Sequence, residues 1–489
     1  MEKLTDDNIR IIFGMKVKRL RTDNQFSLQQ LSEKTGISIS YLNEIENGKK
    51  YPKTDKIADL ARALNVSYDQ LVSMKLAKNM AHIGHFLSLD IVNDFLFQTF
   101  GIDKGTLLSM VANEPIRVSA FINAIYEIAR NYNLKQEHFY FMCLRSYQEL
   151  NQNYFEEIEE AVDRFRNEHG LDEKQLLNVA AYESLLTKQY KYHVKATDFK
   201  QYPALKAMRS ALVPAEKPLL FYNKKLTEQQ RAFLFGRELG FNYLKLEKRP
   251  YTTPWLRFGS FDNVLNNFRA SYFAQALHIP KQSLKKDLEN IFGADRFNPN
   301  FIAHLLEKYH ASPEMLLTRI SNILPVYFGI DELFFIRYSS KEQDLKEISK
   351  ELHLTRHSLQ LAYTISEQNY RRWLTKSLLQ FLLEEKGKAK EPMKIEAVVT
   401  ENGNGNRYLT LSILREMPEL NNNNNSVTLG FVINETAARK IRFLNDRKLD
   451  VSKLGDLSRY EFNEPIELKR LKQLQEREDE YELLVSQSK

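Results

Sequence analysis

Apolar residues recur every three or four positions between residues 9 and 72, a spacing that predicts a series of short helices. The first predicted helix spans residues 9–20. Ser27 and Ser38 are suited to N-cap positions and open the second and third helices, and Gly36 ends the second because glycine readily takes a positive φ. Two further apolar stripes, at residues 57–64 and 68–72, complete a predicted compact module of five helices.

The third predicted helix has an inward face and an outward face. Leu42 and Ile45 face inward, and the outward residues lie in its N-terminal half. The major groove of B-DNA admits one α-helix, and side chains of these types pair with base edges there. The residues expected to read bases are Ser38, Ile39, Ser40, Asn43 and Glu44, and those expected to contact phosphates are Ser27, Tyr41, Asn47, Lys49, Lys50 and Lys53.

The segment SLQQLSEKTGISISYLNEIENGKKYPK resembles the phage-repressor and Cro type of helix-turn-helix, also called the xenobiotic-response-element family. Leu31, Gly36, the Ile37-Ser38 entry and the exit at residues 45–48 carry the resemblance, which covers residues 10–75. It implies a bacterial regulator that binds double-stranded DNA. Residues 1–76 contain 13 Lys and Arg against 10 Asp and Glu, so we expect binding to depend on a homodimer. The alternative is a helical bundle for protein interaction.

Residues 77–204 read mostly as helices and are expected to form a connector or dimerisation region. A short apolar strand then follows at residues 219–222, and Thr227 is suited to cap a long helix. That helix contains Arg237-Glu238-Leu239-Gly240-Phe241. A zinc peptidase has His-Glu-x-x-His at this spacing, because residues i and i+4 share a helix face. Arg237 and Phe241 replace both histidines.

The surrounding pattern resembles the ImmA/IrrE metallopeptidase-like domain, here over residues 205–330, with a second helix at residues 261–280. The resemblance implies a metal-binding carboxylate on that second helix, and the matching position is Arg269. Neither arginine nor phenylalanine can ligate zinc, so we expect no metal, no cofactor and no hydrolysis, and a domain that serves as sensor or spacer. Glu238 is expected to pair with Arg237 or Arg231 on a solvated helix face, in preference to binding a ligand.

The C-terminal region, residues 331–489, is expected to begin with helices up to residue 386 and to continue as a small sheet. Tyr370-Arg371-Arg372-Trp373 lies on one of these helices, either as a site for an anion or as a surface paired with Glu367. His353 and His357 are placed on one helix face, and His82 and His85 near a linker; both pairs are interpreted as ordinary surface or packing histidines. Strands are predicted at residues 395–400, 408–414 and 427–433, with the asparagine tract at residues 421–425 as a surface turn.

Length, charge and cysteine content limit the number of domains, the kind of partner and the expected location of the protein. A chain of 489 residues with 43% hydrophobic residues fits three or four globular units, and the predicted fold class is mainly α with several domains, an α+β unit and a small β-sheet. The net charge of +7 suits a polyanionic partner. A single cysteine, Cys143, a charged N-terminus and the absence of a long apolar run predict a cytoplasmic protein with no membrane segment.

The order of these regions is similar to that of the short-chain fatty acyl-responsive regulators of bacteria. The resemblance implies a small-molecule effector of the acyl-CoA type, although no metal triad and no cysteine cluster near residues 457–465 accompany it. The leading hypothesis is a dimeric, effector-sensing transcriptional regulator. The alternatives are an interaction protein for phage or toxin control, in which the middle domain binds a protein, and an active zinc peptidase, which lacks its histidines.

Overall fold

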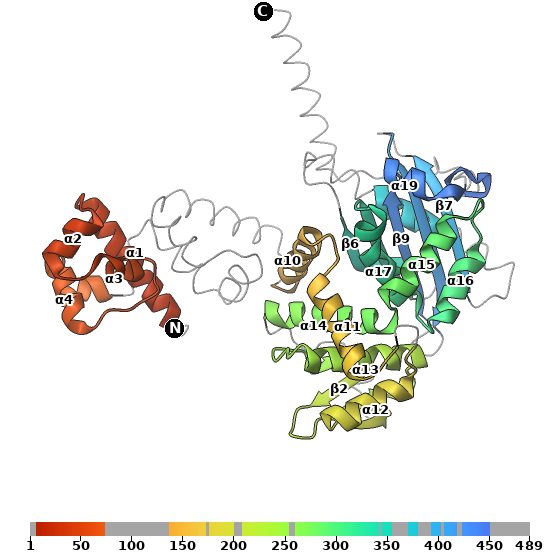
Figure 1. Cartoon of the computed structure of the whole chain (residues 1–489), viewed down its shortest axis with the longest axis horizontal. Coiled ribbons are helices and arrows are strands. Elements are labelled where there is room, and N and C mark those ends of the chain that lie inside the picture. The colour runs from red at the N-terminus through yellow and green to blue at the C-terminus, as the bar shows by residue number, and fades with distance from the viewer. Residues whose placement is uncertain are drawn as a thin grey trace, which may run out of the picture. The chain divides into compact units, whose positions relative to one another are not determined.

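The structure is a computed structural model that describes residues 6–73, 136–172, 176–199, 208–253, 260–341, 344–354, 370–379, 393–401, 405–417 and 423–449 (Figure 1). The chain divides into two compact units. The first comprises residues 1–147 and 257–265, and the second comprises residues 148–256 and 266–489. Within the described residues, none of the helices combines the length and the apolar character that crossing a membrane requires.

The N-terminal head has the five short helices that the apolar spacing predicts. They are α1 (Asp6–Asp23), α2 (Leu28–Thr35), α3 (Ile39–Glu46), α4 (Thr54–Ala63) and α5 (Tyr68–Val72). Ser27 caps α2 in a capping box with Gln30, and Gly36 ends it at a φ of 65°. The core of the head is formed by apolar side chains from all five helices, including Val17, Leu31, Leu42, Ile45, Leu60, Leu64 and Leu71.

The second unit begins with helices that pack on a small sheet. The helices here are α11 (Glu156–Glu168), α12 (Val179–Tyr190), α13 (Glu228–Tyr243) and α14 (Phe261–His278), preceded by α10 (Gln136–Leu150). The sheet contains β1 (His193–Thr197), β2 (Ser210–Val213), β3 (Leu219–Asn223) and β4 (Thr252–Thr253) in the order β1-β3-β2-β4. The predicted strand, the Thr227 cap and the second helix of this region are therefore present.

A second sheet of five antiparallel strands follows, in the order β6-β5-β9-β8-β7. Its strands are β5 (Leu333–Lys341), β6 (Asp344–His353), β7 (Met393–Glu401), β8 (Arg407–Met417) and β9 (Asn423–Val432). Helices α15 (Lys281–Phe292), α16 (Pro299–Lys308) and α17 (Pro313–Ile323) cover one face of it, and α19 (Glu435–Lys440) lies nearby (Figure 1). One hydrophobic core joins these elements from Ile279 to Leu449, across residue 330, where the sequence predicts a domain boundary.

The prediction of helices over residues 331–386 is wrong in its first part, because β5 and β6 occupy residues 333–353. Apolar residues in β6 stand three or four positions apart, a spacing that is typical of a helix. A strand accommodates this spacing here because β6 lies at the edge of the sheet and its register against β5 shifts. His353 is consequently a strand residue, while His357, His82 and His85 lie outside the described residues. The prediction of a surface turn over the asparagine tract is wrong for residues 423–425, which belong to β9, and residues 421–422 lie outside the described part of the chain.

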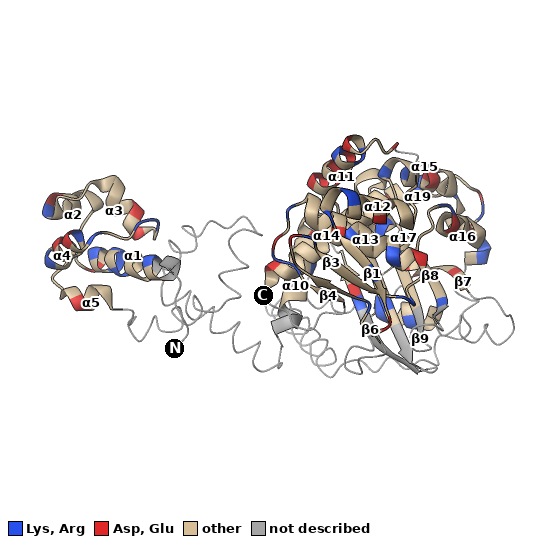
Figure 2. Cartoon of the chain, turned by 90° about the horizontal axis from the view of Figure 1, so that it is seen from below, with Lys and Arg blue, Asp and Glu red and all other residues tan. Residues whose placement is uncertain are grey.

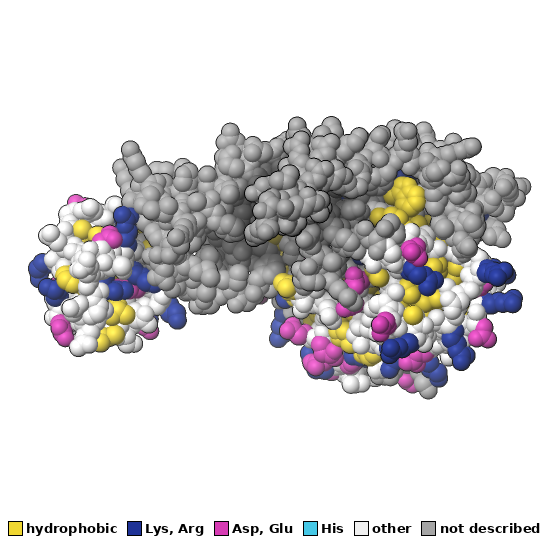
Figure 3. Space-filling view, turned by 90° about the horizontal axis from the view of Figure 1, so that it is seen from above, with side chains coloured by type: hydrophobic (Ala, Val, Ile, Leu, Met, Phe, Trp, Pro, Cys, Tyr) yellow, Lys and Arg dark blue, Asp and Glu magenta, His cyan; other side chains and the backbone are white. Residues whose placement is uncertain are grey.

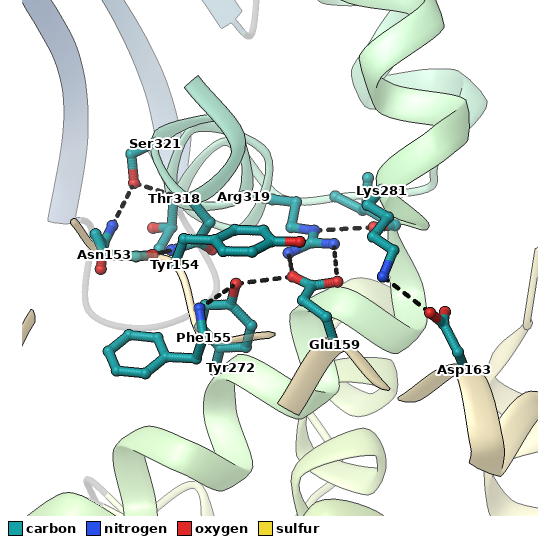
Figure 4. Close-up of polar contacts among 12 residues, drawn as sticks. Asn153, Tyr154, Phe155, Glu159, Asp163, Tyr272, Lys281, Thr318, Arg319 and Ser321 are labelled. Atoms are coloured by element: carbon teal, nitrogen blue, oxygen red, sulfur yellow. Dashed lines mark hydrogen bonds and ion pairs between the residues drawn. The ribbon is translucent and has the colours of Figure 1, made fainter. Parts of the chain in front are cut away.

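A buried ion pair connects the helices around the two sheets (Figure 4). Arg319 of α17 binds both carboxylate oxygens of Glu159 of α11, and the two side chains are 0% and 2% exposed. The Tyr272 hydroxyl of α14 donates to Glu159 Oε1 at 2.7 Å, and Arg319 Nε donates to the carbonyl oxygen of Ile279 at 3.0 Å. A charge buried this deeply is stable only when its hydrogen bonds are satisfied, so the network fixes α11, α14 and α17 relative to one another.

Candidate functional site

Helix α3 presents the residues expected to read bases on its solvent side. Ser38 caps the helix, with its hydroxyl accepting from the backbone N–H of Tyr41, while Leu42 and Ile45 are fully buried. Ser38, Ser40 and Asn43 are exposed, and Ile39 is 47% exposed. An exposed isoleucine at the start of a helix is available for contact with a thymine methyl group.

Asn43 and Glu44 differ in how freely they face solvent. Asn47 donates from Nδ2 to Asn43 Oδ1 at 2.9 Å and to the Asn43 carbonyl at 2.8 Å, which orients the Asn43 amide before any partner arrives. The Asn43 NH₂ group remains available to donate. Glu44 is half-buried, and its carbonyl accepts from the backbone N–H groups of Lys49 and Lys50 at 2.9 and 3.3 Å.

The residues expected to contact phosphates surround this helix. Lys49, Lys50 and Lys53 are exposed in the loop after α3, and the Ser27 hydroxyl is exposed at the start of α2. Tyr41 is half-buried and packs on the core of the head. Lys and Arg also occur along α1 (Figure 2). The space-filling view shows basic side chains on several sides of the head (Figure 3). The positive charge is therefore spread over the head and is not gathered only around α3.

Two features that hold α3 in place were missed by the sequence analysis. Arg21 of α1 donates to both carboxylate oxygens of Glu46 at 2.6 and 2.9 Å and to the Phe26 carbonyl at 2.8 Å, and Glu46 is only 4% exposed. Gly14 lies where α1 crosses α3: an added Cβ would come within 2.2 Å of the Ile45 carbonyl oxygen. A charged residue at a buried helical position, Glu46, was the available signal for the first feature.

The peptidase-like site is formed where α13 packs closely on α14. Gly236 and Gly240 lie one turn apart on α13, and a Cβ at Gly240 would come within 2.9 Å of the carbonyl oxygen of Ala270. The absence of these side chains allows the backbones to approach. Arg237, Glu238 and Phe241 belong to the same buried stretch of α13 as these glycines. The three residues singled out in the sequence therefore lie together.

Glu238 is held by an arginine that the sequence analysis did not identify. Arg249, in the segment after α13, donates from one terminal nitrogen to both oxygens of Glu238 at 2.6 Å, and its guanidinium lies 3.8 Å from the centre of the Phe241 ring. The Tyr192 hydroxyl donates to Glu238 Oε2 at 3.2 Å, and Arg237 donates to Thr253 Oγ1 at 2.8 Å. Burial lowers the pKa of Arg237, although Glu238 opposes this shift.

The expected role of Glu238 on a solvated face is therefore wrong. Glu238 is 2% exposed and pairs with Arg249, while Arg231 lies 3.7 Å from Glu228 at the surface. The residues present do not fit a zinc ion, because Arg237 and Phe241 offer no lone pair and a guanidinium already occupies the carboxylate. Arg269 is a half-buried residue of α14 and equally offers no metal ligand. Among the described residues, no cluster of three or more His, Cys, Asp or Glu side chains is arranged to bind a metal.

The Tyr370-Arg371-Arg372-Trp373 cluster lies on a helix, as expected, at residues 370–379, but it is not wholly a surface cluster. Arg371 is fully buried, and Arg372 donates to both oxygens of Glu351 in β6 at 2.6 and 2.9 Å. Burial alone would raise the pKa of Glu351, but hydrogen bonds from His353 and Arg372 bring it well below its usual range. Glu367 lies outside the described residues.

Two parts of the chain match known protein families. Residues 14–76 match the family described as a helix-turn-helix domain, and residues 187–321 match the family described as an IrrE N-terminal-like domain. The chain thus combines a helix-turn-helix head with an IrrE-like domain.

Relatives of the head are bacterial. The HTH-type transcriptional regulator YazB of Bacillus subtilis is 35% identical over 60 residues, which are 12% of this chain and 87% of YazB. The HTH-type transcriptional regulator MT0491 of Mycobacterium tuberculosis is 34% identical over 58 residues, which are 12% of this chain and only 41% of that relative's length. A solved Mycobacterium tuberculosis transcriptional regulator aligns with 63% of this chain and 86% of its own at 18% identity and a TM-score of 0.42. The chain belongs to the HTH-type transcriptional regulators.

Proposed function

We propose that this protein is a cytoplasmic bacterial transcriptional regulator that binds double-stranded DNA in a sequence-specific manner as a homodimer. The observation that carries the proposal is the exposed N-terminal half of α3, with Ile39, Ser40 and Asn43 outward. The buried Arg21–Glu46 pair fixes α3 against α1, so these side chains are presented by a rigid element. Ser38, Ile39, Ser40, Asn43 and Glu44 would read bases, and Ser27, Tyr41, Asn47, Lys49, Lys50 and Lys53 would contact phosphates.

The IrrE-like domain serves in this proposal as part of a sensor and not as a peptidase. A peptidase would need a metal-activated water at Glu238, where Arg249 is bound instead. The sensor responds to a small-molecule effector, for which acyl-CoA thioesters are the first candidates, and changes the DNA-binding competence of the head. The division into residues 1–76, 77–204, 205–330 and 331–489 remains part of the proposal.

A binding-site selection with the full-length protein tests DNA recognition. Random duplexes retained by the protein are sequenced, and the selected site is then titrated by electrophoretic mobility shift at several salt concentrations. We expect one enriched motif with two half-sites, as a dimer requires. Absence of an enriched motif would refute sequence-specific binding, and a motif with a single half-site bound by one chain would refute the homodimer.

A further inference from the structure

Three arginines lie around the helix that resembles the zinc-binding helix of a peptidase. Arg237 belongs to α13 itself, Arg249 to the segment that follows it, and Arg209 directly precedes β2; we call these three residues the arginine cluster. Arg237 is 8% exposed and the side chain of Arg249 is 9% exposed, whereas Arg209 is an exposed residue. The cluster is therefore mostly buried but has a solvent-accessible side at Arg209.

Thr253 of β4 and Glu238 of α13 bring the arginines together. Arg237 Nη2 donates to Thr253 Oγ1 at 2.8 Å, and the backbone N–H of Arg209 donates to the Thr253 carbonyl at 2.6 Å. Arg249 binds both oxygens of Glu238, the residue next to Arg237. Burial has the largest effect on the pKa of Arg237 and lowers it; Glu238 raises this pKa, and the neighbouring charges of Arg249 and Arg209 lower it further. The three positive charges are thus close enough to repel one another.

The negative charge beside the cluster does not balance it. Glu238 supplies one carboxylate against three guanidinium groups, which leaves two positive charges unbalanced. Glu314 also acts on Arg209, but its carboxylate is bound by Arg337 at 2.6 Å and by Lys350 at 3.3 Å. A buried excess of one charge is costly unless an opposite charge compensates it.

Hydrogen-bond donors of the cluster also lack partners. Arg237 Nε and Arg249 Nε are buried and make no hydrogen bond in the part of the chain that the structure describes. Buried polar atoms in native proteins are almost always paired, with protein, ordered water or ligand. The stretches of sequence before β2 and after β4 that lie outside the described residues, 200–207 and 254–259, contain no Asp or Glu. The unpaired donors therefore indicate an anionic partner from outside the chain.

We propose that the arginine cluster binds a phosphate group. Guanidinium groups bind phosphate oxygens through paired hydrogen bonds, and a phosphate group carries close to two negative charges at neutral pH, which matches the imbalance of the cluster. Arg237, at a position where a zinc peptidase has a histidine ligand, thus binds an anion where the peptidase binds a cation. The inference goes beyond the proposed function, since neither DNA nor an effector of the sensor enters it.

Isothermal titration calorimetry with the full-length protein tests the ligand class. The probes are inorganic phosphate, methyl phosphate and phenyl phosphate at about pH 8, where each carries close to two negative charges, in chloride buffer of matched ionic strength. Acetate is the control with a single charge. We expect at least one phosphate compound to bind saturably at one site per chain and more tightly than acetate. Saturable binding of none of them, or equally tight binding of acetate, overturns the inference.

The same titrations distinguish two sources of the phosphate group. Tighter binding of a monoester than of inorganic phosphate assigns the site to the phosphoryl group of an organic molecule. The reverse order assigns the site to the free phosphate ion.

Two variants locate the site. Arg237→Met removes a buried charge and keeps most of the side-chain volume, so the Tm without ligand stays the same or rises, while the phosphate affinity falls by about tenfold or more. Arg209→Gln removes the exposed charge of the cluster and should also lower the affinity, without a change in Tm. Arg439→Gln, which removes the same charge from an exposed pair on α19, is the control and leaves both unchanged.

An unchanged phosphate affinity in Arg237→Met overturns the site, and a lower Tm with that unchanged affinity assigns the arginine to folding. If Arg237→Met does not fold, Arg209→Gln decides, because an exposed side chain can be replaced without disturbing the core. An unchanged affinity in that variant then overturns the site.

Discussion

At the scale of single residues, the head separates side chains that read sequence from side chains that supply charge. Asn43 projects from the exposed side of α3 with its amide oriented by Asn47, whereas Lys49 and Lys50 lie in the loop that follows. A bidentate amide distinguishes bases, but a lysine at a phosphate contributes equally to every sequence.

Asn43→Ala is therefore expected to cost about 1–3 kcal/mol on the selected DNA site and little on random duplex. The combined change Lys49→Ala and Lys50→Ala is expected to weaken both and to reduce the salt slope by about 2. Mobility-shift titrations at several salt concentrations check both statements. An unchanged slope in the lysine double variant, or equal losses on both DNAs in Asn43→Ala, would contradict these roles.

The Glu238–Arg249 pair gives a second prediction at this scale. Arg249→Ala removes the ion-pair partner of the buried Glu238 carboxylate and leaves the Tyr192 hydroxyl as its hydrogen-bond donor among the described residues, so it should destabilise the protein by about 3 kcal/mol. The added change Glu238→Gln should recover part of the loss. Urea unfolding of the full-length protein measures both. Arg439→Ala, which removes an exposed pair with Glu435, is the control and should cost less than about 1 kcal/mol.

At the scale of elements, close helix packing depends on glycines that the hydrophobic pattern does not distinguish. Gly14 permits α1 to cross α3, and Gly236 and Gly240 permit α13 to approach α14. The pattern predicted the helices of the head and the strands β7, β8 and β9, because their apolar periods are regular. It failed for β5 and β6, where pairing with neighbouring strands outweighed a helix-like spacing.

Gly14→Ala tests the first of these contacts. Alanine favours a helix by about 1 kcal/mol over glycine, but a Cβ within 2.2 Å of a backbone oxygen must force the helices apart, so the clash prevails. We expect faster hydrogen exchange in α1 and α3 and weaker DNA binding. Gly293→Ala is the control, because the nearest atom to its Cβ is at 3.2 Å and its backbone is in the helical region. Unaltered exchange in α1 and α3 would contradict the close contact.

At the scale of the whole molecule, the buried His278 and the half-buried Glu314 determine how stability changes with pH. Burial lowers the pKa of His278 from 6.5 to about 4. Burial would raise the pKa of Glu314, but Lys350 and Arg337 lower it from 4.5 to about 2. Between the folded and unfolded pKa values the unfolded chain binds more protons, so in both cases stability falls as the pH falls.

Stability should therefore begin to decrease below about pH 6.5 because of His278, at up to about 1.4 kcal/mol per pH unit, and should decrease further below about pH 4.5 because of Glu314. Urea unfolding of the full-length protein from pH 7.5 to 4 measures the first decrease. In His278→Gln the slope between pH 6.5 and 4.5 should become shallower. A slope that the substitution does not change would mean that His278 is not the group that titrates.

The sequence by itself determined the five-helix head, the residues outward on α3, and the loss of both histidines from the peptidase-like helix. These features depend on local spacing and on side-chain chemistry. The tertiary structure decided which charges meet: Arg21 with Glu46, Arg249 with Glu238 and Arg319 with Glu159 are separated by 25, 11 and 160 residues. It also decided that Arg237 and Arg249 are buried with donors that lack a partner among the described residues. Such pairings depend on how distant elements pack, and no local pattern in the sequence specifies them.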